Sequence, residues 1–70
     1  MVVKAKETLI IARAEAGLTI KELSEKSKVP QSTICRAENG YPLSIKSANK
    51  LCVSLHYGFT DLFQISDKQK

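Results

Sequence analysis

Apolar residues recur three or four positions apart along this chain, which is the spacing that places them on one side of a helix. The first such stretch, residues 4–16, consists of strong helix formers and ends before Gly17. The side chains expected to face inward are Leu9, Ala12 and Ala16, together with Ile10 or Ile11. No stretch keeps the period-two alternation of a strand, so every element is predicted to be helical.

A capping box marks the start of the second predicted helix, residues 20–27. In this motif the Thr19 hydroxyl accepts a hydrogen bond from the backbone N–H of Glu22, and the Glu22 carboxylate accepts one from the backbone of Thr19. Leu23 is the clearest core residue of the helix, with Ile20 beside it.

A third helix is predicted from Gln31 to Glu38, with Asn39-Gly40 as its stop. Only Ile34 and Ala37 can face a core. The turn before this helix is so short that the second and third helices must cross steeply, which is the helix-turn-helix pattern. The outer face offers amide, hydroxyl and guanidinium groups, which can form hydrogen bonds with the edges of DNA bases. A solvated surface helix is the alternative interpretation.

A fourth helix, residues 45–55, is predicted after a Ser44 cap. Its apolar stripe consists of Ile45, Ala48, Leu51, Cys52 and Leu55. Thr60 is expected to cap a last short helix, residues 61–65.

The length of 70 residues is that of one domain with a modest core. We predict an all-α fold, a compact five-helix bundle with a central helix-turn-helix over residues 1–66, followed by a polar tail over residues 67–70. No apolar run approaches the roughly 20 residues of a membrane span, and the N-terminal residues do not resemble a signal peptide. We therefore expect a cytoplasmic protein.

The net charge of +4 and the pI near 9.3 favour an anionic partner such as nucleic acid. Two cysteines are too few for a disulfide framework, and His56 is the only histidine, so we expect no metal and no cofactor. Cys52 is expected in the core. Cys35 is expected on the exposed face of the third helix, where a redox switch is a minor alternative. The carboxylates are interpreted as surface or capping groups, so an enzyme is poorly supported.

Several residues stand at the spacing of a known family. They are Leu18-Thr19, Leu23, Val29, Gln31-Ser32-Thr33-Ile34, Arg36 and Glu38-Asn39-Gly40. On these residues the chain resembles the Cro/phage-repressor family of helix-turn-helix proteins, the XRE family, over roughly residues 7 to 65. The resemblance implies a lambda-repressor-like five-helix bundle whose helix 31–38 enters the DNA major groove.

The resemblance also implies three sets of site residues. The side chains that would contact bases are Gln31, Ser32, Cys35 and Arg36. The side chains that would contact phosphates are Thr19, Lys21, Thr33, Asn39, Ser44 and Lys46. An ion pair between Arg13 and Glu38 would have a structural role. Simpler alternatives are a phosphate contact for Gln31, helix capping for Ser32 and Thr33, and solvation for the lysines.

The sequence departs from the family pattern at four positions: Ile20, Ser24, Lys28 and Pro30, where the family often has Gln, Ala, Gly and a capping Ser. A non-glycine residue at position 28 either adopts left-handed backbone angles, at a cost of about 1–2 kcal/mol, or gives the turn a different shape. These departures affect the detailed contacts more than the fold.

We therefore expect a sequence-specific, double-stranded-DNA-binding transcriptional regulator, a repressor, that acts as a homodimer on DNA. The candidates for the dimer contact are Tyr57, Phe59, Leu62, Phe63 and Ile65, with closure of the core as their alternative role. The alternative function is that of an antitoxin or accessory protein whose helix-turn-helix fold mainly binds a protein partner.

Overall fold

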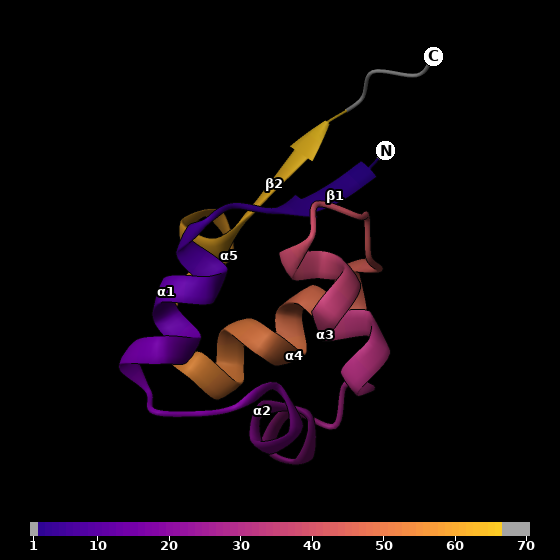
Figure 1. Ribbon diagram of the computed structural model, residues 1–70. Helices are drawn as coiled ribbons and strands as arrows, with labels where there is room; N and C mark the ends of the chain where they lie inside the picture. The colour runs from indigo at the N-terminus through magenta and orange to yellow at the C-terminus, as the bar shows by residue number, and fades with distance from the viewer. Residues whose placement is uncertain (1, 67–70) are drawn as a thin grey trace.

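The computed structural model describes residues 2–66, which form five helices and a two-stranded antiparallel sheet (Figure 1). The helices are α1 (Thr8–Glu15), α2 (Ile20–Ser27), α3 (Gln31–Glu38), α4 (Ile45–Leu55) and α5 (Phe59–Leu62). The strands are β1 (Val2–Ala5) and β2 (Phe63–Ser66). In Figure 1, α1 and α3 lie on opposite sides of the view and α4 runs between them. The predicted tail, residues 67–70, lies outside the described residues.

The prediction of an all-α fold was wrong at both ends of the chain. α1 begins at Thr8 instead of residue 4, and the last helix ends at Leu62 instead of residue 65. The backbone on either side of these helices is extended and pairs as β1 and β2, with Val3 opposite Ile65. Each strand finds its hydrogen-bonding partner at the opposite end of the chain, and four residues are too few to show an alternation. The local sequence therefore does not reveal the sheet.

The first four helices are each followed by a residue in the left-handed backbone region. Gly17 and Gly40 have φ angles of 72° and 90°, which glycine adopts without a steric penalty. Lys28 and His56 have φ angles of 66° and 62° and lack this freedom, so each costs about 1–2 kcal/mol. The turn between α2 and α3 thus bends through left-handed angles even though glycine is missing.

The predicted starts of α2 and α5 had different outcomes. The capping box of α2 is confirmed: Thr19 Oγ1 accepts from the N–H of Glu22 at 3.1 Å, and Glu22 Oε1 accepts from the N–H of Thr19 at 2.9 Å. The Thr60 cap was wrong. α5 begins earlier, where Asp61 Oδ2 accepts a hydrogen bond from the N–H of Gly58 at 3.2 Å.

One apolar core joins all the elements. Its buried side chains are Val3, Leu9, Ala12, Leu23, Val29, Ile34, Ala37, Ala48, Leu51, Cys52, Leu55, Leu62 and Phe63. Leu62 and Phe63 are fully buried, so these two dimer candidates close the core instead.

Ala16 and Ile45 were predicted to face inward and are exposed, and both Ile10 and Ile11 are exposed although one of the two was expected in the core. α1 is short and contributes only a narrow strip, Leu9 and Ala12, to the core. The other apolar side chains of α1 therefore remain on the surface.

A buried serine fixes the turn between α2 and α3. Ser27 Oγ donates a hydrogen bond to the carbonyl of Leu23 at 2.7 Å and accepts one from the N–H of Val29 at 3.3 Å. The side chain of Val29 is itself buried between the helices. These contacts hold α3 at a defined angle to α2, which is what a helix needs if its outer face is to fit a rigid partner.

Candidate nucleic-acid interface

The outer face of α3 carries all four residues that were predicted to contact bases. Gln31, Ser32, Cys35 and Arg36 are exposed, whereas Ile34 and Ala37 hold the opposite face of the helix in the core. Within residues 2–66, no hydrogen bond or ion pair engages the side chains of Gln31, Ser32 and Arg36. Their amide, hydroxyl and guanidinium groups are therefore available to a partner outside the chain.

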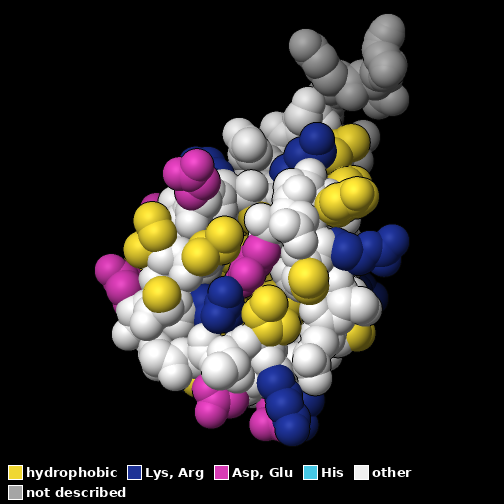
Figure 2. All heavy atoms as spheres, viewed as in Figure 1, with side chains coloured by type: hydrophobic (Ala, Val, Ile, Leu, Met, Phe, Trp, Pro, Cys, Tyr) yellow, Lys and Arg dark blue, Asp and Glu magenta, His cyan; other side chains and the backbone are white. Residues whose placement is uncertain are grey.

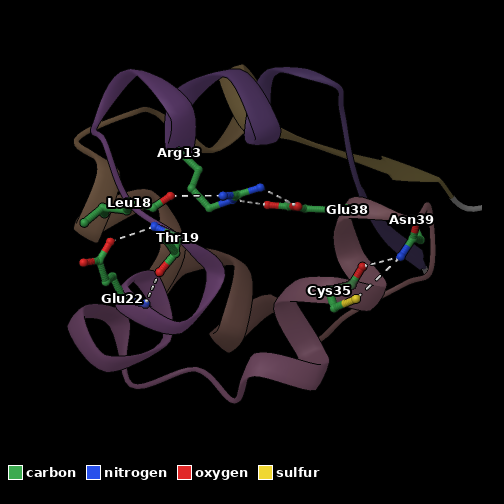
Figure 3. Close-up of polar contacts among 7 residues, drawn as sticks. All are labelled: Arg13, Leu18, Thr19, Glu22, Cys35, Glu38 and Asn39. Atoms are coloured by element: carbon green, nitrogen blue, oxygen red, sulfur yellow. Dashed lines mark hydrogen bonds and ion pairs between the residues drawn. The ribbon is translucent and has the colours of Figure 1, made fainter.

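The structure joins Arg13 of α1 to Glu38 of α3 in a two-pronged ion pair (Figure 3). Arg13 Nε lies 2.6 Å from Glu38 Oε2, and Arg13 Nη2 lies 3.0 Å from Glu38 Oε1. The two side chains are only 19% and 9% exposed. The hydrogen bond and the charge of Glu38 raise the pKa of Arg13 above its ordinary value, against the opposing effect of burial.

This ion pair has two consequences for α3. Glu38 is the only carboxylate of the helix, and it is turned inward and neutralised by Arg13, so the outer face carries no negative charge that would repel phosphates. Arg13 Nη1 also donates to the carbonyl of Leu18 at 3.0 Å, a contact that the sequence did not predict. One guanidinium therefore connects α1, the segment before α2 and the end of α3.

The first turn of α3 has no side-chain cap, because Pro30 precedes it. The N–H groups of this turn point away from the helix and carry the positive end of its dipole. Such a helix start suits a phosphate group. Thr33, which was predicted to contact a phosphate, is half-buried and is the third residue of this helix.

Three of the predicted phosphate contacts already serve helix ends. The Thr19 hydroxyl belongs to the capping box. The Asn39 amide donates to the carbonyl of Cys35 at 2.9 Å (Figure 3). Ser44 Oγ accepts from the N–H of Ser47 at 3.1 Å, which confirms the predicted cap of α4, and it also donates to the Ser47 hydroxyl. Any phosphate contact would have to share these groups with the caps.

Lys21 and Lys46 are the phosphate candidates with free charges. Both are exposed, and neither ammonium group has a hydrogen bond or ion pair with another residue of the described part of the chain. No Asp or Glu occurs between Glu38 and Asp61, so the sequence around Lys46 offers no local compensation for its charge.

The two cysteines are free and lie in different surroundings. Cys35 is exposed on α3, with the Asn39 amide nitrogen 3.7 Å from its Sγ. Cys52 is a core residue of α4, as predicted, and burial together with the charge of Asp61 raises the pKa of its thiol. Within residues 2–66, no group of three His, Cys, Asp or Glu side chains is arranged to hold a metal ion.

A family model described as helix-turn-helix matches residues 9–62, which is most of the chain. The chain therefore belongs to the helix-turn-helix family of Cro/phage-repressor (XRE) type. This is a family of DNA-binding regulatory domains and is not typically enzymatic. No curated protein and no solved structure matches the chain. Among the described residues, no helix is long and apolar enough to cross a membrane.

Proposed function

We propose that this protein is a sequence-specific transcriptional regulator, a repressor, that binds double-stranded DNA with α3 in the major groove. The observation that carries the proposal is the outer face of α3, where the side chains of Gln31, Ser32 and Arg36 have no partner among the described residues while Glu38 is turned inward to Arg13. In this arrangement Gln31 and Arg36 read base edges, and Ser32 and Cys35 line the same contact.

Phosphate contacts position α3 in the groove. Lys21 and Lys46 each neutralise a phosphate. The uncapped N–H groups at the start of α3, together with the Thr33 hydroxyl, bind a third phosphate. The capping side chains of Thr19, Asn39 and Ser44 make weaker contacts, because each already bonds its own helix.

A homodimer on DNA completes the proposal, because one small module makes few contacts and two copies can read half-sites about 34–36 Å apart. Of the predicted dimer residues, Tyr57 and Phe59 are half-buried and Ile65 is 50% exposed. Ile65 lies on β2, which pairs with β1, and the other edge of β1 is bridged to Leu43 through Val3. We place the dimer contact at β2, where strand pairing with a second copy would also cover Ile65.

The alternative function is an antitoxin or accessory protein that mainly binds another protein. Exposed apolar side chains on α1 and α4 are the observation that favours it, because such side chains often mark protein contacts. Purification with a stoichiometric partner, together with no binding to any DNA duplex, would favour this reading over ours.

The proposal can be tested with operators selected from a random duplex library, followed by affinity measurements over a salt series. Gln31→Ala should weaken binding to the selected site by about 1–3 kcal/mol and leave random-sequence binding almost unchanged. Lys46→Ala should weaken both kinds of binding and lower the slope of log K against log salt by about 0.9.

Lys6→Ala is the matched control, since it removes the same charge from a side chain that is bonded to α5. The Lys6 ammonium donates to the carbonyl of Thr60 at 2.7 Å, on the α5 side of the molecule. This variant should keep the slope of the unmodified protein. If Lys46→Ala and Lys6→Ala behave alike, the charge acts only at long range and the proposed phosphate contact is wrong. If no duplex binds even at low salt, the DNA proposal itself is wrong.

A further inference from the structure

The outward surface of α1 combines exposed apolar side chains with negative charge. Ile10 and Ile11 are 41% and 53% exposed, and Ala14 is exposed beside them. Glu7 and Glu15 flank these residues at helical spacing. Figure 2 shows this arrangement on the side where α1 lies, at the left, as apolar groups bordered by acidic ones. We call these five residues the α1 face.

The cations nearest to the α1 face are engaged elsewhere. Arg13 is bonded to Glu38 and to the carbonyl of Leu18. The Lys6 ammonium is bonded to the carbonyl of Thr60. Glu15 Oε1 accepts a hydrogen bond from the Tyr57 hydroxyl at 2.6 Å, which leaves the carboxylate charged, so the charge that the α1 face presents to solvent is negative.

A groove of opposite character lies between α2 and α4. It encloses about 320 Å³ and is lined by Lys26, Ser27, Asn49, Lys50, Val53 and Ser54. Two lysines and no carboxylate belong to this lining, and Val53 is 74% exposed. We call it the α2/α4 groove. Its lining combines an exposed valine with two positive charges, whereas the α1 face combines exposed apolar side chains with two negative charges.

We propose that the α1 face of one molecule docks in the α2/α4 groove of a second copy of this chain. Ile11 then packs against Val53, and Glu7 and Glu15 lie toward Lys26 and Lys50. Two α1 faces repel each other because both are negative, and two α2/α4 grooves repel each other because both are positive. The attraction between the negative face and the positive groove therefore favours a head-to-tail arrangement. A head-to-tail pair leaves the groove of one molecule and the α1 face of the other unoccupied, so the contact can repeat along a row of molecules.

The contact is weak in solution, because few side chains take part and such interfaces fall below the size of stable complexes. On DNA, neighbouring molecules hold each other at high effective concentration, and the same contact produces cooperative binding to adjacent sites. That consequence rests on the proposed DNA-binding function. The contact itself does not, so its test contains no DNA.

The test is sedimentation velocity of the full chain over a concentration series at low and high salt. All proteins carry Ile65→Lys, which separates the proposed dimer contact at β2 from the contact tested. The sedimentation coefficient should rise with concentration at low salt, and the rise should shrink at high salt because the charged pairs are exposed. Ile11→Lys and Val53→Glu should each weaken the association about tenfold or more. Tyr41→Lys adds a charge at an exposed apolar residue outside both surfaces and should have no effect.

A mixture of the Ile11→Lys and Val53→Glu proteins decides the arrangement. Each protein retains one intact surface, so the mixture should form one-to-one pairs that neither protein forms alone. If the mixture shows no such pairs, or if only one of the two substitutions weakens the association, a surface pairs with itself and the proposal is wrong. No association of the unmutated surfaces at millimolar concentration and low salt would also overturn it. If Ile11→Lys instead releases a different copurifying protein, the α1 face belongs to that partner.

Discussion

α3 and α4 follow one another in the chain but have different roles. α3 places two side chains in the core and exposes its polar ones, and no side chain caps its start. α4 places four side chains in the core, namely Ala48, Leu51, Cys52 and Leu55, and Ser44 caps its start. α4 therefore contributes to the stability of the domain, and α3 is held in place by contacts that other helices supply.

The difference shows how a small domain can present a recognition surface without a large core of its own. α3 is positioned by Ile34, by Ala37 and by the Glu38 ion pair to α1. Its outer side chains are then released from any structural task. Substitutions on this outer face should change binding without changing stability, whereas substitutions on the inner face of α4 should do the reverse.

The largest expected effect is that of Leu51→Ala in α4. Leu51 is completely buried, so the substitution removes apolar contacts and leaves a cavity, at a cost of about 2–5 kcal/mol. For a domain whose total stability is of the order of 5–15 kcal/mol, this is a large fraction. Urea unfolding followed by circular dichroism measures it. A loss below about 1 kcal/mol would show that α4 is not the stabilising helix.

Arg13→Met should cost about 2–3 kcal/mol, because it leaves Glu38 largely buried without a partner. The expected value lies below the roughly 3–5 kcal/mol of a fully buried pair, since Arg13 is partly exposed. The double variant Arg13→Met with Glu38→Leu removes both charges and should be more stable than the single variant in the same unfolding assay. An unchanged melting temperature for Arg13→Met would remove the ion pair from our account of how α3 is held.

Lys28→Gly should stabilise the domain by about 1 kcal/mol, because glycine adopts the left-handed angles of this position without the steric cost. His56→Gly tests the same effect after α4, because His56 is the other non-glycine residue with left-handed backbone angles. Thermal unfolding of the two variants compares them directly. Destabilisation by both substitutions would mean that the lysine and histidine side chains make contacts worth more than the relief of strain.

Arg36→Ala on the outer face of α3 should have the smallest effect on stability, within about 0.5 kcal/mol, because the side chain has no partner among residues 2–66. On our proposal it nevertheless lowers affinity for a selected operator by about 1–3 kcal/mol. Melting and binding are measured on the same preparation. A clear loss of stability with unchanged binding would reverse the roles that we give to the two faces of α3.

Local patterns were sufficient for most of the helical framework. The bounds of α2, α3 and α4 follow from capping residues, from Gly40 and from apolar spacing, and the structure confirms them. These signals act within a few residues of each other, so the sequence displays them directly. The family follows from the same stretch, since most of the residues that carry the resemblance lie in α2, in α3 and in the turn that joins them.

Long-range contacts were the part that local patterns could not supply. β1 and β2 exist because the two ends of the chain meet, so the sequence near either end still predicts helix. In the same way, helical spacing alone did not show that Ile10, Ile11 and Ile45 face solvent, because a neighbouring element decides which side of a helix is covered.

By itself, the sequence determined the bounds of α2, α3 and α4, the caps of α2 and α4 and the polar face of α3, because these depend on residues close together in the chain. Only the tertiary structure decided the terminal sheet, the burial of Leu62 and Phe63, the acidic α1 face and the basic α2/α4 groove. Each of these depends on which distant segments remove one another from water, and that is a property of the packed chain.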